Sequence, residues 1–431
     1  MKCLWITLAD PDPPRNGQFL YSRGLIHGLT AAGMEVHVVG LTRPRGQHRH
    51  GQFADGVYWW LAPHQWSADH QPSPRWVSLA SALPQLAAQT NTPPMRRILN
   101  ERLTGGGSWD AIVFDSICVG WALSVVQQHY ATARVRPRLV YLSHNHEQSV
   151  AEQIAADTRP FWKRQFKHVD AWKVGRLERW LVRHTDLITS NSPADCEKFR
   201  PSRADRRVEF LPPGYGGRRI PSRQIGSQLP RRAIIVGSFD WIAKRTSLEE
   251  FLAVADPLFA AAGIELDVVG NADESFLGRL RNKVRATRLT GRVDDIHPYM
   301  EQARLALVPD LLGGFKLKAL DYVFNRLPIF AIAGSVPGMP LHETESIFLF
   351  RDHRSLAEGV IKAIDDLDLL NRAQQAAYTA CCDQFDWTNI GQRLMCAMSL
   401  VDHSQLTTHR AAPVTPRWST TPEVGSLDSP A

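Results

Sequence analysis

The sequence predicts an α/β protein of two domains, each built around a parallel β-sheet. Three observations lead to this prediction. At 431 residues the chain is too long for one core of ordinary size. Short apolar, strand-like runs alternate with helical segments along most of it, which is typical of a parallel sheet covered by helices on both faces. A stretch rich in Pro, Gly, Ser and Arg interrupts this alternation once and divides the chain into two halves.

The first domain is predicted over residues 1–205. Its first strand lies at residues 4–8, and the following helix carries apolar residues at helical spacing until Gly33 ends it. The second strand lies at residues 36–41. Later strands are expected at residues 111–114, 139–142 and 187–189, each followed by turn residues and a helical segment.

Residues 206–232 are predicted to form a linker, because they hold little that could fill a core. A second series of strands begins at residues 233–237 and continues at 266–270, 304–308 and 328–332, so a second domain is predicted over residues 233–385. Residues 386–402 are expected to form a C-terminal helix that crosses back to the first domain. Residues 403–431, rich in Ser, Thr and Pro, are expected to be a disordered tail.

The composition narrows the class of protein. No stretch approaches the roughly 20 apolar residues of a membrane-spanning helix, and the short apolar start runs into residues 10–14, which do not resemble a signal cleavage site. The 6 cysteines show no C-x-x-C spacing, so we expect free thiols in a reducing, cytoplasmic compartment and no structural zinc. Lysine plus arginine exceed aspartate plus glutamate by 50 − 43 = 7, which favours anionic partners.

Residues 308–329 are the strongest candidate for a functional segment. They predict a buried strand, a turn containing Gly313 and Gly314, a helix that carries Lys318 and Asp321, and the next strand. Backbone N–H groups at such a helix start bind phosphate, and a lysine one turn in adds positive charge. A carboxylate on the same face can accept hydrogen bonds from two ribose hydroxyls. An ordinary helix start with a surface Lys–Asp pair explains the same residues equally well.

This segment resembles the donor-nucleotide motif of retaining GT-B glycosyltransferases, family four in particular, within the glycosyl transferases group 1. There a Gly-rich loop leads into a helix with a Glu-x7-Glu pattern, followed by Pro-Val-Val. Asp321 matches the second acidic residue, which in the family binds the ribose, whereas the first acidic position falls on Gly313. Residues 313–318 also resemble the Gly-x-Arg-Leu-Lys loop of a subgroup, which implies that Lys318 lies near the diphosphate.

Other segments are similar to the family in the same order. Residues 12–18 resemble its Pro-x-x-Gly-Gly loop, residues 236–245 the basic loop for the pyrophosphate, and residues 290–295 its Thr-Gly-x-Val-x-Asp turn near the base. Residues 143–147 resemble its His-Asn-x-Glu and follow a predicted strand, at the end where open α/β sheets bind ligands. The resemblance covers about residues 1–400 and implies the GT-B fold, with two Rossmann-like domains facing each other across a cleft.

The resemblance further implies a glycosyltransferase of hexosyl type that retains the anomeric configuration. Its donor would be a nucleotide-diphosphate sugar, its acceptor a glycan or lipid-linked envelope precursor, and it would need no cofactor and no obligatory metal. The catalytic candidates are His144 and Lys318. The candidates for donor binding are Gly17, Ser238, Lys244, Arg245, Arg292, Gly313, Gly314, Phe315, Lys316, Leu317 and Asp321. The candidates for acceptor binding are Asn16, Gln18, Asn145 and Glu147.

Several alternatives remain open. His144, His146 and Glu147 suggest a metal site, but histidines at i and i+2 of a strand point apart, and His144 also suits a buried, hydrogen-bonded core position. Because Gly313 replaces an acidic residue, a degenerate protein that binds nucleotide or glycan is a further hypothesis. The fold also hosts epimerases and inverting transferases. A dehydrogenase is disfavoured, since neither half carries G-x-G-x-x-G after its first strand.

A basic and aromatic stretch lies between Arg159 and His184. Its basic residues are Arg159, Lys163, Arg164, Lys167, Lys173, Arg176, Arg179 and Arg183, and its aromatic residues are Phe161, Trp162, Phe166, Trp172 and Trp180. The stretch suits a domain helix with a solvated basic face and buried aromatic side chains. It also suits a helix at an anionic membrane surface, at the inner face of the membrane. Nucleic acid is not expected as a partner, because no recognisable motif supports it.

Overall fold

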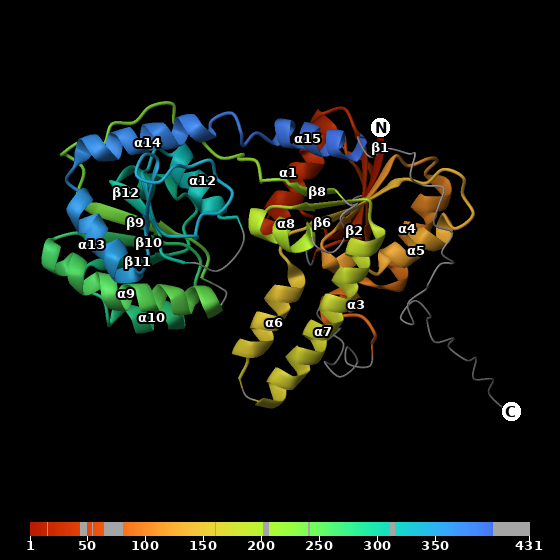
Figure 1. The fold of residues 1–431 in the computed structure, drawn as a ribbon, viewed down its shortest axis with the longest axis horizontal. Coiled ribbons are helices and arrows are strands. Elements are labelled where there is room, and N and C mark those ends of the chain that lie inside the picture. Colours follow the sequence, from red (N-terminus) through yellow and green to blue (C-terminus); the bar gives the residue numbers. More distant parts are fainter. Residues whose placement is uncertain are drawn as a thin grey trace. The chain divides into compact units, whose positions relative to one another are not determined.

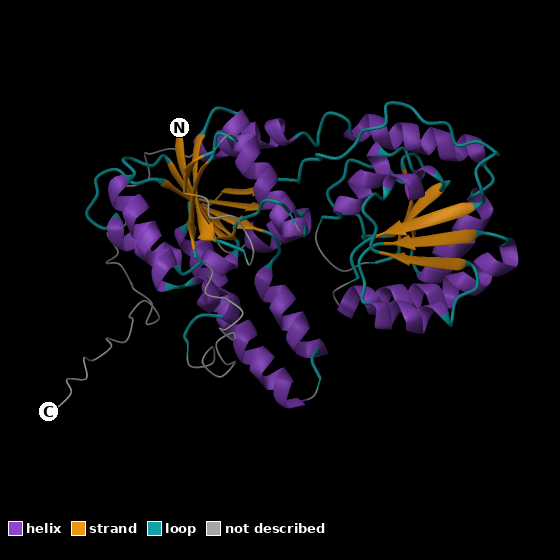
Figure 2. Ribbon diagram, turned by 180° about the vertical axis from the view of Figure 1, so that it is seen from behind, coloured by secondary structure: helices purple, strands orange, loops and turns teal. Residues whose placement is uncertain are grey.

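The computed structural model describes residues 1–14, 16–43, 50–53, 55–63, 81–159, 161–200, 207–239, 242–310 and 315–399. The chain forms two compact units. The first contains Met1–Leu211 and the helix α15 (Trp387–Ser399), and the second is Pro212–Asp386. Each unit is an α/β structure built on its own sheet, as Figures 1 and 2 show. The predicted class, two Rossmann-like α/β domains, is confirmed.

The first unit contains an eight-stranded sheet in the order β3-β4-β2-β1-β5-β6-β7-β8. Its strands are β1 (Lys2–Ala9), β2 (Glu35–Leu41), β3 (His50–Gln52), β4 (Tyr58–Ala62), β5 (Ala111–Asp115), β6 (Arg138–Ser143), β7 (Leu187–Ser190) and β8 (Arg207–Phe210). Neighbouring strands are parallel except β3 and β4. Because side chains alternate along a strand, β1 places Leu4 and Ile6 in one core cluster and Cys3 and Trp5 in another.

Helices cover both faces of this sheet (Figure 2). They are α1 (Gly17–Ala31), α3 (Gln85–Thr90), α4 (Pro93–Gly105), α5 (Ala122–His129), α6 (Glu147–Asp157), α7 (Phe161–His184), α8 (Pro193–Phe199) and α15, with a 3₁₀ turn at Ile117–Val119. The helix α15 packs on α1, and glycines of both helices lie at the contact. A Cβ on Gly391 would lie 2.1 Å from the carbonyl carbon of Gly28, and a Cβ on Gly24 would lie 2.3 Å from the Trp387 ring. Only glycine permits this approach of the two helices.

Strand β8 differs from the sequence-based expectation. Residues 207–210 were assigned to the linker, but they pair in parallel with β7 and extend the first sheet. All four residues are only half-buried, because β8 is an edge strand. An edge strand needs no continuous apolar run, so its sequence, Arg-Val-Glu-Phe, did not stand out.

The second unit contains a six-stranded parallel sheet in the order β11-β10-β9-β12-β13-β14. Its strands are β9 (Arg232–Val236), β10 (Glu265–Val269), β11 (Thr287–Gly291), β12 (Leu305–Val308), β13 (Ile329–Ile332) and β14 (Ile347–Phe350). Its helices are α9 (Ile242–Ala262), α10 (Glu274–Arg281), α11 (His297–Glu301), α12 (Leu317–Phe324), α13 (His353–Ala363) and α14 (Leu367–Cys381). The strand order reverses between β9 and β12, and open α/β sheets bind ligands at the carboxyl ends of the strands at such a point.

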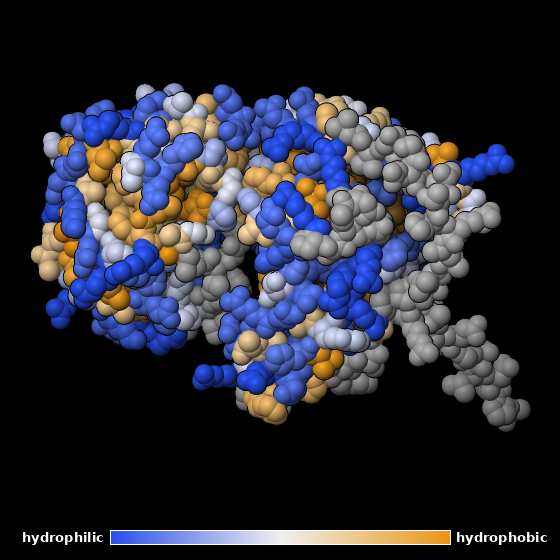
Figure 3. All heavy atoms as spheres, in the orientation of Figure 1, coloured by the Kyte–Doolittle hydropathy of each residue, from blue (hydrophilic) through white to orange (hydrophobic). Residues whose placement is uncertain are grey.

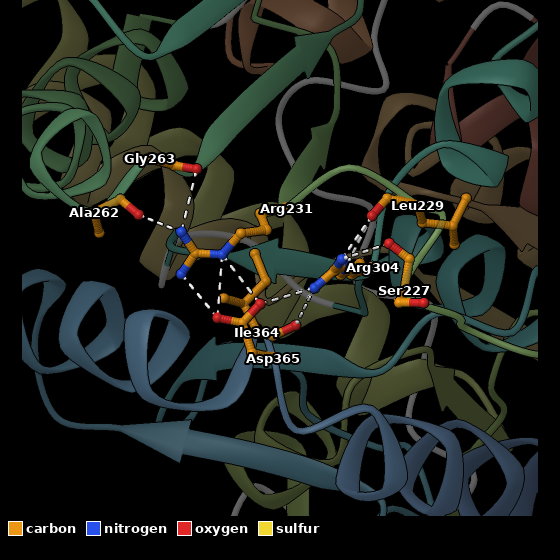
Figure 4. Close-up of polar contacts among 8 residues, drawn as sticks. All are labelled: Ser227, Leu229, Arg231, Ala262, Gly263, Arg304, Ile364 and Asp365. Carbon is orange, nitrogen blue, oxygen red and sulfur yellow. Dashed lines mark hydrogen bonds and ion pairs between the residues drawn. The ribbon is translucent and has the colours of Figure 1, made fainter.

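The opposite, amino edge of this sheet is held by a buried arginine, Arg304, which directly precedes β12. Its guanidinium donates to the carbonyl of Leu229 at 2.6 Å and to that of Ile364 at 3.1 Å, and it pairs with Asp365 at 2.9 Å. Arg231 binds the same carboxylate from the segment before β9 (Figure 4). This network joins the starts of β9 and β12 to the segment after α13, so its role is structural.

The helices α6 and α7 lie side by side and extend beyond the sheet of the first unit (Figures 1 and 2). The expectation that the aromatic residues of this stretch are buried is wrong for four of the five, Phe161, Trp162, Phe166 and Trp172, which are exposed. The reason is that the first half of α7 reaches past the body of the unit. Among the described residues, none of the helices is both long and apolar enough to span a bilayer.

Candidate functional site

The loops that follow β9 and β10 meet closely at the carboxyl edge of the second sheet. Gly237 donates its N–H to the carbonyl of Val269 at 3.0 Å, and Phe239 donates to that of Asn271 at 2.6 Å. Gly270 has a φ of 145°, and a Cβ there would lie 1.6 Å from the carbonyl oxygen of Gly237. Both the positive φ and the close approach of the Gly237 carbonyl require glycine at position 270. This glycine therefore allows the two loops to pack together beside the switch point.

A buried cluster of charges lies at this switch point. Asp310 follows β12, and its two carboxylate oxygens bind Lys316 Nζ at 2.8 Å and Lys318 Nζ at 2.5 Å. Burial opposes ionisation of Asp310, but the two ammonium groups outweigh it and lower its pKa to about 2. The carboxylate is thus fully ionised at neutral pH and holds both lysine side chains in place.

A third lysine, Lys244, also acts on this cluster. Burial lowers the pKa of Lys316, Asp310 opposes that shift, and the charges of Lys318 and of Lys244 in α9 add to it. Among the described residues, the ammonium groups of Lys316, Lys318 and Lys244 all act on this region, and Asp310 pairs with two of them. A group with concentrated negative charge, such as a diphosphate, is the complementary ligand.

Asp321 lies one turn after Lys318 on the helix α12. Burial raises the pKa of its carboxyl to about 6, against a hydrogen bond from Tyr215 and the charge of His297, which both favour ionisation. The Tyr215 ring stacks on Phe324 with centroids 4.6 Å apart, and His297 Nδ1 lies 2.7 Å from Asn325 Oδ1. Aromatic and polar groups thus surround a carboxylate that is half-buried at the surface of the unit.

The other residues predicted for donor binding occupy different settings. Arg245 donates to the Phe239 carbonyl at 2.6 Å and forms an ion pair with Asp273. Ser238 and Arg292 are exposed on the loops after β9 and β11. Phe315 lies 5.8 Å from the Phe385 ring, and Leu317 packs at the edge of the core. Gly313 and Gly314 lie outside the described residues.

A histidine–aspartate pair occupies the carboxyl ends of β5 and β6 in the first unit. His144 Nε2 lies 2.7 Å from Oδ1 of Asp115, which is fully buried, and Trp5 Nε1 donates to Oδ2 at 3.0 Å. The described residues offer no hydrogen bond to the other ring nitrogen, Nδ1. The Tyr21 ring of α1 meets the imidazole edge-on at 5.5 Å. Asp115 therefore orients His144 and leaves Nδ1 for a ligand.

Acidic side chains surround the start of α6. Glu178 of α7 accepts hydrogen bonds from the backbone N–H groups of Glu147 at 2.9 Å and Gln148 at 2.8 Å, and from the Tyr141 hydroxyl at 3.2 Å. Burial raises the pKa of Glu178 to about 7 despite these hydrogen bonds. Burial also raises the pKa of Glu147. The charge of His144 and a hydrogen bond from the Asn145 side chain oppose this shift. His144, Asn145 and Glu147 thus gather at one strand end.

The two histidines of residues 143–147 have separate partners. His146 is the N-cap of α6, where its Nδ1 lies 2.7 Å from Ser149 Oγ, and its ring lies 5.1 Å from that of Phe199. His144 instead binds Asp115. The arrangement gives the metal interpretation no support.

The predicted residues at the start of α1 are exposed or half-buried. Asn16 is the N-cap, and its side chain accepts a hydrogen bond from the Phe19 N–H at 2.9 Å. Gly17 and Gln18 form the first turn. Asn16 therefore caps the helix α1, and Gly17 and Gln18 lie on the same helix as Tyr21, which contacts His144.

The comparisons with known proteins identify the second unit. Residues 230–366 match the family model described as Glycosyl transferases group 1. This region is similar to the glycosyl transferases of group 1. The match contains β9, β12 and α12, the elements that hold the lysine cluster and Asp321. The resemblance predicted from residues 308–329 is thereby confirmed at the level of this family. A comparison with curated proteins finds no match.

Solved glycosyltransferase structures resemble the chain over nearly its whole length. Sucrose-phosphate synthase from Thermosynechococcus elongatus is 17% identical, with a TM-score of 0.67 over 92% of this chain and 98% of that chain. WaaG, a glycosyltransferase involved in lipopolysaccharide biosynthesis, is 16% identical, with a TM-score of 0.60 over 93% and 100%. HepE from Anabaena in complex with UDP and glucose is 14% identical, with a TM-score of 0.58 over 93% and 100%. At these identities the likeness shows the fold, which is of the GT-B class.

Sequence reasoning missed three acidic residues. Asp115 is the last residue of a buried strand and Asp310 lies two residues after one, which is a usable signal because parallel strands present ligand-binding groups at that end. Glu178 offered no comparable signal, since it lies within a long helix and meets α6 only in the folded unit.

Proposed function

We propose that the protein is a glycosyltransferase that transfers a hexose from a nucleotide-diphosphate sugar. The observation that carries the proposal is the positive cluster at the β9–β12 switch point, with Asp321 one turn along the same helix. Lys316, Lys318 and Lys244 provide charge for the diphosphate, and Asp321 provides an acceptor for two ribose hydroxyls. The solved HepE complexes with UDP and with UDP-glucose support a nucleotide sugar as the donor.

The geometry suggests how the residues promote the reaction. Breaking the bond between the sugar and the diphosphate places negative charge on the leaving phosphate, and preorganised ammonium groups lower the energy of that charge. Lys318 is the catalytic residue in this role, and Asp310 positions it before the donor binds. The described second unit thus provides its own cations for the leaving group, and we propose that no metal is needed.

We further propose retention of the anomeric configuration, with a route assisted by the leaving phosphate. His144 would contact the donor sugar or the acceptor through Nδ1, with Asn145 and Glu147 beside it. The acceptor would be a glycan or lipid-linked envelope precursor, and the protein would act in the cytoplasm at the inner face of the membrane. The involvement of WaaG in lipopolysaccharide biosynthesis supports an envelope acceptor.

A donor screen tests the proposal. The purified chain is incubated with UDP-, GDP-, ADP- and dTDP-sugars while its melting temperature and the release of nucleoside diphosphate are measured. We expect one base to stabilise the protein, and Asp321→Ala and Lys318→Ala to lose that response. Lys283→Ala, which removes an exposed lysine elsewhere in the second unit, should retain it. Absence of a response to every donor would contradict the proposal, and tight nucleotide binding without turnover would favour the degenerate binding protein.

The His144–Asp115 pair favours a second candidate, an inverting transferase. An imidazole held at Nε2 by a buried carboxylate can accept a proton at Nδ1 from an acceptor hydroxyl and so act as a general base. The anomeric configuration of the product decides between the two, since an inverted product would exclude retention. In an inverting enzyme, Asp115→Asn should also lower the turnover number far more than it raises KM.

A further inference from the structure

The far end of the α6–α7 hairpin carries apolar side chains that face solvent. Phe161, Trp162, Phe166, Val169 and Trp172 of α7 are between 45% and 69% exposed, and every residue from 161 to 169 is exposed. Figure 3 shows hydrophobic and strongly hydrophilic residues together at this end of the first unit. Exposed aromatic clusters of this kind mark interaction surfaces, because leaving them in water is unfavourable.

These five residues form a stripe along one side of the helix. At about 100° per residue they fall within an arc of roughly 140°. The residues that α7 buries in the first core, such as Val174, Leu177 and Leu181, fall outside that arc. The stripe is therefore a second apolar face, and the described residues of the chain do not cover it.

Basic residues accompany the stripe. Residues 159–176 contain six Lys or Arg against one acidic residue, Asp170. Asp170 accepts a hydrogen bond from the N–H of Gln85 at 2.8 Å, and Lys173 donates to the carbonyl of Ser81 at 2.6 Å, so these two charges are bound to the body of the unit. The other five basic residues, Arg159, Lys163, Arg164, Lys167 and Arg176, are exposed or half-buried.

The cationic groups lie beside the aromatic rings. Lys163 Nζ is 5.1 Å from the Trp162 ring centroid, and the Arg176 guanidinium is 4.9 Å from that of Trp172. A surface that combines insertable aromatic rings with adjacent cations matches a bilayer of anionic lipids. The rings enter the boundary between headgroups and acyl chains, while the cations remain at the phosphates.

We propose that the stripe of α7 docks the protein on an anionic lipid bilayer. The charge complementarity selects this partner, because a nonspecific apolar contact would not require the five accompanying cations. The docking rests on the proposed function, in which the enzyme works at a membrane. It assigns membrane binding to a particular surface of the first unit. The helix α6, about 16 Å long at 1.5 Å per residue, separates that surface from His144 and its neighbours.

Vesicle co-flotation of the full chain tests the proposal. The vesicles are phosphatidylcholine with and without phosphatidylglycerol, at low and high salt. We expect binding only to the anionic vesicles, weakened by salt. Trp162→Ser with Phe166→Ser should lower the partition coefficient roughly tenfold or more, and Lys163→Gln with Lys167→Gln roughly thirtyfold. Two matched pairs serve as controls and should bind as wild type: Leu86→Ser with Val135→Ser, which are also exposed apolar residues, and Lys283→Gln with Lys362→Gln.

Several results would overturn the proposal. One is equal binding to both vesicle types, and another is unchanged binding of the α7 variants. A third is a concentration-dependent dimer in sedimentation velocity that Trp162→Ser with Phe166→Ser abolishes, because the stripe would then bind a second copy of the chain. Nucleotide binding is measured on the same samples without lipid. If the wild-type chain binds nucleotide but does not bind anionic vesicles, the docking surface alone is refuted. If it binds the vesicles but no nucleotide, the proposed donor site alone is refuted.

Discussion

Replacing Asp310 with asparagine should destabilise the second unit strongly. Asp310 is the anion that the structure pairs with Lys316 and Lys318, and the side chains of Asp310 and Lys316 are 11% and 8% exposed. Removing one partner of such a buried pair is destabilising and costs about 3–5 kcal/mol. For a unit of 386 − 212 + 1 = 175 residues, that corresponds to a fall in melting temperature of roughly 6–20 °C.

The lowered pKa of Asp310 predicts how stability depends on pH in acid. The folded pKa of Asp310 is about 2, below its unfolded value of 3.8. A depressed pKa contributes stability that is present above the unfolded pKa and is lost as the pH falls towards the folded one. The shift corresponds to about 2 kcal/mol, which agrees in order of magnitude with the cost of breaking the pair.

Scanning calorimetry at neutral pH measures the effect, and a double variant provides the control. Asp310→Asn with Lys316→Met removes both charges, so it should recover much of the lost stability. A nucleoside diphosphate should stabilise Asp310→Asn more than the wild type, because its phosphates replace the missing anion. A melting temperature for Asp310→Asn equal to that of the wild type, or a double variant no more stable than the single one, would refute the reasoning.

Three further predictions concern other buried groups. Burial raises the pKa of Asp321 to about 6, so the affinity for nucleoside diphosphate in calorimetric titrations should fall by up to about tenfold per pH unit below that value; Asp321→Asn should flatten this dependence. The pKa of Glu178 is about 7, above its unfolded value of 4.5, so the stability it contributes below pH 4.5 is lost as the pH rises to 7. In urea unfolding, the free energy of unfolding of Glu178→Gln should therefore rise by about 3 kcal/mol relative to that of the wild type between pH 4.5 and 8. If the difference between the two proteins is the same at both pH values, the raised pKa of Glu178 is contradicted. Arg304→Met removes the buried donor to the Leu229 and Ile364 carbonyls, whereas Asp365 keeps its ion pair with Arg231. The variant should lower stability by about 1–3 kcal/mol without changing nucleotide affinity, and altered affinity would show that the network reaches the site.

The sequence by itself determined the two α/β units and most of their elements. The strands predicted at residues 111–114, 139–142 and 266–270 are present as β5, β6 and β10, because a strand buried in a parallel sheet requires a continuous apolar run and the turns between elements carry their own residue types. The helix α12 was predicted with Lys318 and Asp321 on it for the same local reason. A motif that lies within one strand, turn and helix can be recognised without knowledge of the fold.

Only the tertiary structure decided which groups meet. His144 and Asp115 are 29 residues apart, and they form a pair because β5 and β6 are neighbours in the sheet. Lys318 pairs with Asp310, which lies eight residues earlier in the chain, whereas the sequence alone left a surface pair with Asp321 as one of two interpretations. The pattern of α7 likewise predicts a helix with apolar and basic residues. Whether its aromatic rings are buried depends on how far the helix extends beyond the sheet, and the packing of neighbouring elements sets that.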